Sequence, residues 1–472
     1  MFKSKALDVL RAFETKDFRL FNDFINSPYY NKNEELILFY EKLKKFAPQF
    51  QNKKLERTIF YKLCFPKKKY NEKHLGYLLS DLMYLLDEYL MVRLSEENKM
   101  NDYISLMNHY ITLGLEKNYN SVLKSAEKLQ KNYDYEDSQY YFYQYKIAST
   151  SNRYFELQNK RKFDQHIQVA SDNFDLYFIA QKLKYACEII NRKSILSAQY
   201  ELKLIDELVI YLKANPHDDI PAISIYYEIL FMLLYPKNKR HFFKLNLLLH
   251  KHSEKFPPKE SKDMYSFALN HCIKQINMGN TEYNRELFEL YKVMISKEII
   301  YHNGVLSPWL YKNVASVALR LKEFDWTKNF IETQCPKVDK NYRDSAYAYN
   351  LAYLHFSQGE YKEAMWRLHE VEFNDVFFHL DTKTMLLKIY FELKDIEPLL
   401  SLIDAFKVYL KRNKHISTYM KTSYRNLIKF VQKSLRLPDG DKAKWQALYE
   451  EIQNVKHVAS TTWLLEKIKE KT

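Results

Sequence analysis

The sequence predicts an all-α protein, and three observations lead to this fold class. Apolar residues recur every three to four positions through almost the whole chain, and no run alternates strictly between apolar and polar residues. Only six of the 472 residues are glycine, although hairpins between strands and phosphate-binding loops both depend on glycine. Short polar or proline-containing breaks separate the helix-length blocks, as expected between antiparallel neighbours. We therefore expect a continuous array of stacked helix pairs.

Composition places the chain among packed cytoplasmic proteins. Apolar residues make up 46% and charged residues 28%, which is too apolar for a disordered chain. The longest apolar stretch, Leu75 to Leu94, contains three acidic residues and therefore predicts a buried helix rather than a membrane span. Asp8 precedes any long apolar run, so we expect no signal peptide. The four cysteines lie far apart, which indicates neither a disulfide framework nor a zinc site: Cys64, Cys187, Cys272 and Cys335.

The first elements along the chain form an N-terminal helical module, which we place at residues 1–97. Apolar spacing from Leu7 to Ile25 is helical, and the polar segment that follows predicts a turn. Asn33 is expected to cap a helix over Glu34–Phe46, because a side-chain oxygen at that position accepts from the free amides of the first turn. The stretch Leu75–Leu94 supplies the last helix of the module.

Residues 98–300 are predicted to form diverged helical hairpins. Loops are clearest at 215–221 and 255–259, where prolines stand among polar residues. The predicted helices are Asp102–Glu116, Tyr119–Asn132, Asp175–Asn191, Tyr200–Leu212, Ala222–Leu234 and His241–Lys251.

Residues 301–414 carry a repeat. The stretch Tyr349–Ala364 contains a Leu-Ala pair, a turn Gln-Gly-Glu-Tyr and a small residue, Ala364, in the second helix. It resembles a tetratricopeptide repeat, in which two helices cross at the small residues. The block Asn313–Trp326 aligns with it at an offset of 37 residues, and Leu386–Leu399 aligns less well at an offset of 35. This resemblance implies a right-handed α-solenoid, followed at 415–472 by a basic helix and a capping helix.

The resemblance also implies a binding surface, because the first helix of each tetratricopeptide pair lines a concave groove. An amide at equivalent places, Asn313 and Asn350, offers one donor and one acceptor to a peptide backbone. Basic side chains would meet carboxylates, and tyrosines would act as rigid anchors. The groove residues expected in this way are Lys312, Asn313, Arg320, Tyr349, Asn350, Tyr353 and Lys388.

A second candidate surface is a basic ridge. From Ala405 to Leu437 the chain has nine Lys or Arg residues and no acidic residue. Five of them recur at helical spacing and should lie along one helix face: Lys421, Arg425, Lys429, Lys433 and Arg436. Either this ridge binds an anion, or acidic side chains of neighbouring helices offset it. A further basic stretch, Lys42 to Lys73, holds eleven basic residues against two acidic ones.

No motif of a catalytic, nucleotide-binding or metal-binding site occurs in the chain. We therefore expect a non-enzymatic scaffold or adaptor without cofactor or metal, whose groove binds a protein or peptide segment carrying acidic side chains. The alternative from another class is a nucleic-acid-binding basic α-solenoid, since the net charge is +14.

Overall fold

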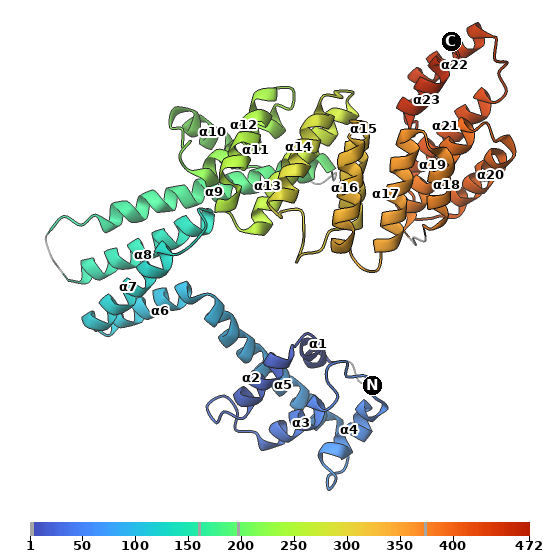
Figure 1. Ribbon diagram of the computed structural model, residues 1–472. Coiled ribbons are helices and arrows are strands. Elements are labelled where there is room, and N and C mark those ends of the chain that lie inside the picture. Colours follow the sequence, from blue (N-terminus) through green and yellow to red (C-terminus); the bar gives the residue numbers. More distant parts are fainter. Residues whose placement is uncertain (1–3, 159–161, 196–198, 372–374) are drawn as a thin grey trace. The chain divides into compact units, whose positions relative to one another are not determined.

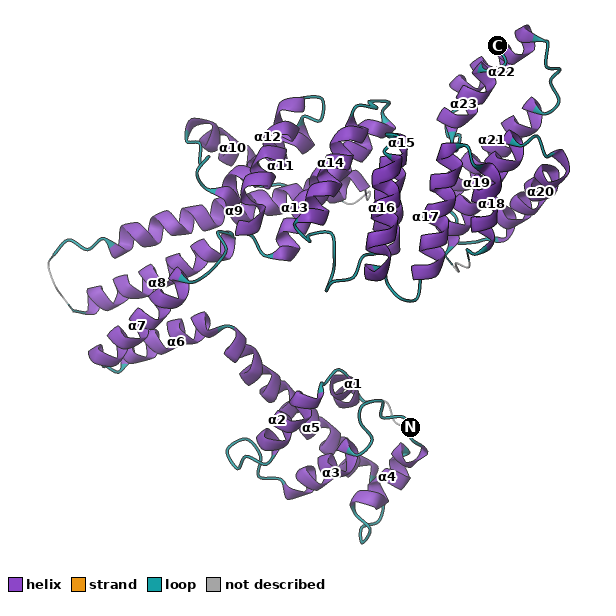
Figure 2. Ribbon diagram, in the orientation of Figure 1, coloured by secondary structure: helices purple, strands orange, loops and turns teal. Residues whose placement is uncertain are grey.

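The computed structural model describes residues 4–158, 162–195, 199–371 and 375–472. Within these ranges, helices are the only regular elements apart from two isolated β-bridges, so the all-α prediction is confirmed (Figure 2). The chain divides into two compact units, an N-terminal unit of Met1–Lys182 and a C-terminal unit of Leu183–Thr472. The boundary falls inside the long helix α9, His166–Ile195.

The N-terminal unit contains two packed groups of helices. The first surrounds an aromatic core between Ala6 and Tyr89, in which Tyr40 meets the ring of Phe21 edge-on at 4.9 Å. Asn33 caps α3 as predicted, accepting from the backbone amides of Glu35 and Leu36. The first group is α1 Lys5–Arg11, α2 Thr15–Ile25, α3 Glu34–Lys44, α4 Arg57–Cys64 and α5 Glu72–Glu97. The second is α6 Lys99–Thr112, α7 Glu116–Lys131 and α8 Ser138–Leu157.

The C-terminal unit continues from α9 as a series of helix pairs (Figure 1). Its helices are α10 Ile205–Ala214, α11 Pro221–Leu234, α12 Lys239–His252, α13 Pro258–Asn277, α14 Tyr283–Ser296, α15 Pro308–Arg320, α16 Phe324–Gln334, α17 Arg343–Gln358, α18 Tyr361–His369, α19 Val376–Glu392, α20 Ile396–Arg412, α21 Thr418–Ser434, α22 Lys442–Asn454 and α23 Thr461–Lys469. From α11 onward each helix packs on its sequence neighbours, and α13 also packs on α11, α15 on α17, and α17 on α19.

One turn geometry joins the two helices of several pairs. A residue with left-handed backbone follows the first helix at Gly114, Gly279, Lys322, Gly359 and Lys394. In each turn the next residue donates its amide to the carbonyl five positions earlier, at 2.9 to 3.1 Å. This hydrogen bond satisfies a carbonyl that the end of the helix would otherwise leave unpaired. The turn therefore recurs in the three aligned blocks and also in the pairs α6–α7 and α13–α14, which sequence comparison did not align.

Small residues lie where the helices of a pair meet. Ala352 and Ala364 are fully buried in the pair α17–α18, and so are Ala315 and Thr327 in α15–α16. The pair α19–α20 instead buries a leucine at each of the equivalent positions, 387 and 399.

Several predicted helix boundaries were wrong. The helix predicted over Asp102–Glu116 runs from Lys99 to Thr112, because the left-handed Gly114 ends it. The helix predicted to start at Tyr200 begins at Ile205, directly after the left-handed Leu204.

Candidate functional site

A cavity of about 490 Å³ lies along the first helices of four consecutive pairs in the C-terminal unit. Helices α13, α15, α17 and α19 supply most of its wall, with further residues from α14 and from Ser460. We call this cavity the first-helix groove. The side chains at its wall are mixed. Aliphatic residues come mainly from α13 and α14, aromatic residues from α14 and α17, charged residues from α15 and α19, and amides from α13 and α15. Such a mixture suits a polar chain that also carries an apolar side chain.

Lys312 crosses the groove from α15 to α19. Its ammonium group forms an ion pair with the carboxylate of Asp381, and it lies 4.9 Å from the centroid of the Phe378 ring. Both groups are on α19, so this side chain holds two walls of the groove in register. Asp381 is also the only carboxylate among the described residues that line the groove.

Lys388 lies deeper in the groove. Its ammonium group is 5.4 Å from the ring centroid of Trp463, at the start of α23. Burial lowers the pKa of Lys388 to about 8 from its usual 10.5, because removal from water outweighs the attraction of Asp381, and the nearby Arg320 adds repulsion. Lys388 therefore remains mostly charged at neutral pH at a cost in free energy. An anion bound beside it would recover that cost.

Arg320 completes the positive side of the groove. It is exposed at the end of α15 and lies beside the hydroxyl of Tyr353. Burial raises the pKa of Tyr353, and the guanidinium partly opposes this shift. With Lys312 and Lys388, three cations line the groove against one carboxylate, so its electrostatic potential favours acidic groups.

The groove brings together six of the seven residues that the repeat alignment selected. Lys312, Asn313, Arg320, Tyr349, Tyr353 and Lys388 all line it. Tyr349 is only 5% exposed and packs edge-on against Phe378 at 5.5 Å, so it forms the floor rather than a projecting anchor.

Asn350 requires a correction, because it is fully buried and does not line the groove. One residue beyond Tyr349 is a turn of about 100° around the helix, and this directs Asn350 toward the Tyr311 hydroxyl between the helices. It therefore cannot hold a bound peptide. Asn277 on α13 lines the groove, as Asn313 does, and supplies a second amide at its wall.

Sequence reasoning missed the contributions of α13 and α14 and the role of Asp381. The available signal was Met278-Gly279-Asn280, which is similar to Gln358-Gly359-Glu360 at the turn of the aligned repeat. Aligning on that glycine would have identified α13 as a first helix. Asp381 lies upstream of the block that was aligned and left no comparable signal.

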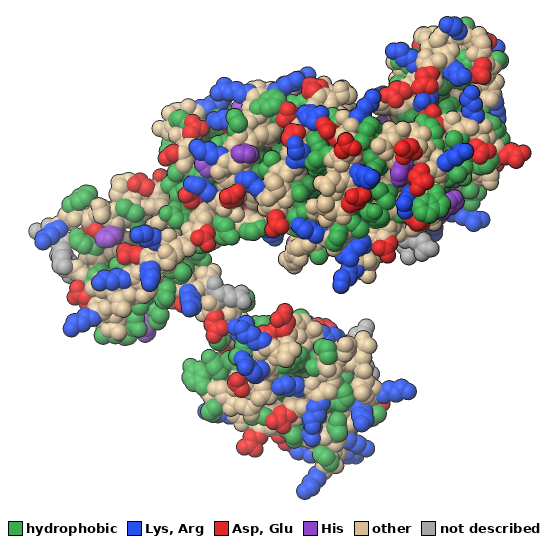
Figure 3. Space-filling view, in the orientation of Figure 1, with side chains coloured by type: hydrophobic (Ala, Val, Ile, Leu, Met, Phe, Trp, Pro, Cys, Tyr) green, Lys and Arg blue, Asp and Glu red, His purple; other side chains and the backbone are tan. Residues whose placement is uncertain are grey.

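The basic ridge lies on α21 and is partly neutralised. Glu451 of α22 contacts Lys433 at 2.6 Å and Lys429 at 3.5 Å. Among the described residues, no ion pair reaches Lys421, Arg425 or Arg436. Glu451, on the helix that follows, therefore offsets the positive charge of two of the five ridge residues. On the face shown in Figure 3, acidic and basic side chains of the C-terminal unit are interspersed.

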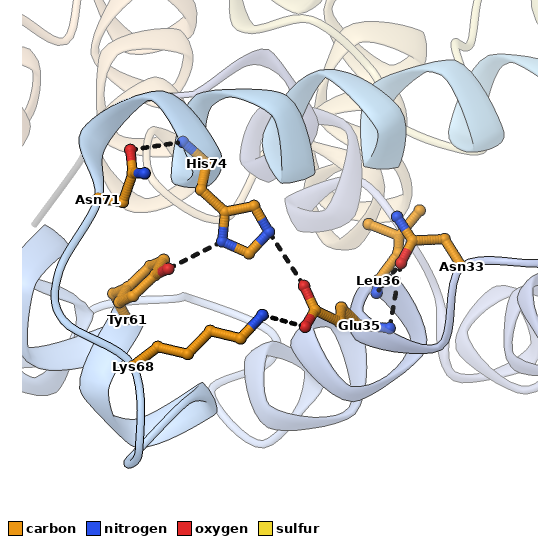
Figure 4. Close-up of polar contacts among 7 residues, drawn as sticks. All are labelled: Asn33, Glu35, Leu36, Tyr61, Lys68, Asn71 and His74. Atoms are coloured by element: carbon orange, nitrogen blue, oxygen red, sulfur yellow. Dashed lines mark hydrogen bonds and ion pairs between the residues drawn. The ribbon is translucent and has the colours of Figure 1, made fainter.

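The basic stretch Lys42–Lys73 surrounds α4 in the N-terminal unit, where several basic side chains are visible in Figure 3. A polar network holds the loop between α4 and α5, which belongs to this basic stretch (Figure 4). Glu35 on α3 pairs with Lys68 and accepts from His74 Nε2 at 3.1 Å, and His74 Nδ1 lies 2.8 Å from the Tyr61 hydroxyl. The hydrogen bond from Lys68 and its charge lower the pKa of Glu35. This network ties the loop to α3, α4 and α5, and it pairs one lysine of the basic stretch, Lys68, with a carboxylate.

Within the described ranges, no three His, Cys, Asp or Glu side chains converge as metal ligands. Every helix in those ranges is too short or too polar to span a lipid bilayer. No protein-family model, curated protein or solved structure matches this chain.

Proposed function

We propose that the C-terminal unit is a tetratricopeptide-like α-solenoid that acts as a non-enzymatic scaffold, and that its first-helix groove binds an acidic segment of a partner protein. The observation that carries the proposal is the groove itself, where first helices of consecutive pairs place three cations against one carboxylate.

The repeat assignment is supported by backbone geometry rather than by side chains alone. Lys322 and Lys394 adopt the same left-handed conformation as Gly359, although lysine adopts it at a cost. The three turns occur at the spacings of 37 and 35 residues found by alignment. A shared and unfavourable conformation at equivalent positions is expected of repeats that diverged in sequence while keeping one turn.

Charge is what selects an acidic ligand. Arg320 offers a planar fork that can pair with both oxygens of a carboxylate, while Lys388 is a point charge in a partly buried place. Lys312 is already paired with Asp381, so it orients the wall. A carboxylate near Arg320 and Lys388 is therefore the group we expect, and Asn313 and Asn277 are placed to hydrogen-bond the backbone of the same segment.

Selection of phage-displayed random dodecapeptides on the immobilised full chain tests this proposal. The same library is selected on an Arg320→Gln/Lys388→Met double variant, and binding of individual peptides is measured by fluorescence anisotropy. We expect peptides enriched in Asp and Glu on the unchanged chain. Their affinity for the double variant should fall by about tenfold or more, because Arg320 loses its paired contact with the carboxylate and Lys388 is removed from a partly desolvated place.

The control removes the same charge outside the groove, at two exposed residues of α20, as Lys411→Met/Arg412→Gln. This variant should keep the affinity. Equal losses in both variants would mean that net charge alone attracts the peptides, and recovery of no acidic peptide would contradict the proposal outright. Retention on nucleic acid at about 50 mM salt, lost steeply as salt rises, would favour the alternative function instead.

A further inference from the structure

A second cavity of about 280 Å³ lies upstream of the first-helix groove in the same unit. Its walls come from the C-terminal part of α9, from Tyr226 on α11 and from α13. Two of these helices pack together, α11 and α13. We call it the upstream cavity.

Both cavities are lined by α13. Asp263, Ser266, Phe267 and Asn270 line the upstream cavity, whereas Ile273, Ile276 and Asn277 line the groove. At about 100° per residue, these seven positions cover half of the helix circumference, and the groove set is centred about 75° around α13 from the upstream set, so the two cavities open on adjoining faces of the helix. Asp263 lies about twelve residues before the centre of the groove set, or about 18 Å along the helix at 1.5 Å per residue. About six residues of extended chain span that distance.

The charge changes from one cavity to the other along α13. Lys184 and Arg192 are the cations of the upstream cavity, and Glu188 and Asp263 are its carboxylates. Glu260 adds a third carboxylate behind the wall, where it contacts Lys184 at 3.0 Å and accepts from Tyr226 at 2.7 Å.

Asp263 is the carboxylate of the upstream cavity that is available to a ligand. It is exposed, and among the described residues no ion pair or hydrogen bond reaches its side chain. Glu188, by contrast, is already paired with Arg192 at 3.4 Å within α9. The excess charge is therefore positive in the groove and negative at Asp263.

We infer that the upstream cavity is a second subsite, in which Asp263 receives a basic side chain of the same segment whose acidic part occupies the first-helix groove. This inference rests on the proposed function. The partner segment is then extended and bipartite, with a Lys or Arg separated from its acidic residues by about six residues or more. Asn270 and Ser266 supply uncharged polar groups between the two charged ends.

The test selects the phage-displayed random dodecapeptides on the full chain and on an Asp263→Lys variant. Peptides selected on the unchanged chain should carry Asp or Glu and also, about six residues or more away, Lys or Arg. The variant should lose the basic preference and keep the acidic one. A selected peptide should bind the variant about tenfold more weakly, whereas its acidic half alone should bind both chains equally. Glu332→Lys, at an exposed residue of α16 outside both cavities, is the matched control and should behave as the unchanged chain.

The outcomes separate the two proposals. Acidic peptides without a basic preference, or a basic preference that survives Asp263→Lys, would overturn the second subsite and leave the groove in place. Absence of any acidic preference on the unchanged chain would overturn the proposed function and this inference with it. A circular dichroism melt of the variant identifies a folding defect, and the acidic-half peptide reports on the groove in the same protein.

Discussion

Replacing Lys388 by methionine should stabilise the C-terminal unit at neutral pH. Methionine keeps most of the unbranched side-chain volume beside Trp463 and removes the charge that burial disfavours. A fall in pKa from 10.5 to about 8 corresponds to about 3 kcal/mol of free energy spent on keeping the folded protein protonated at pH 7. The variant should recover a large part of this free energy of unfolding.

The sign of the pH dependence follows from the same shift. Between about pH 8 and 10.5, the unfolded chain holds a proton on Lys388 that the folded chain has released. The contribution of Lys388 to the free energy of unfolding of the unchanged protein therefore rises with pH across that interval. The free energy of unfolding that Lys388→Met gains over the unchanged protein should be constant below pH 8, fall between pH 8 and 10.5, and vanish above pH 10.5.

Urea unfolding followed by tryptophan fluorescence measures the effect. All five tryptophans lie between Trp309 and Trp463, so the signal reports the C-terminal unit alone. Comparing the variant with the unchanged chain at pH 7 and at pH 9.5 isolates Lys388 from the many tyrosines that also titrate. An equal free energy of unfolding at pH 7, or an advantage that does not shrink with pH, would refute the reasoning.

Four further outcomes are expected. Gly359→Ala should lower the free energy of unfolding by about 1 kcal/mol, because φ is +83° there. Lys394→Gly, at the equivalent turn with φ +58°, should raise it. Urea unfolding of the two variants should therefore show changes of opposite sign. Asn33→Ala should cost about 1 kcal/mol through loss of the cap, visible by circular dichroism while the tryptophan transition stays unchanged. Glu451→Gln should cost less than about 1 kcal/mol, and that cost should disappear at about 1 M salt because its lysine partners are half-exposed. Acidic peptides should bind the groove more weakly as pH rises above 8, since Lys388 loses its proton in the free protein; a flat anisotropy profile from pH 7 to 10 would contradict a contact with this residue.

The sequence by itself determined the elements that depend on local chemistry. Helical periodicity and scarce glycine indicated an all-α chain, and Asn33 marked the start of α3 because a cap acts over three residues. The turn at Gly359 was readable for the same reason, since a left-handed glycine and two small residues lie within one short stretch. Six groove positions followed from that register.

Only the tertiary structure decided what meets across helices. Asn350 and Tyr349 are neighbours in sequence, yet one side chain faces the Tyr311 hydroxyl while the other forms the groove floor. Asp381 reaches Lys312 from 69 residues away, and Glu451 neutralises part of a ridge that looked free of acidic residues. Such pairs depend on the packing of distant helices, because a side chain's partners are set by distances in space that the spacing along one helix does not contain.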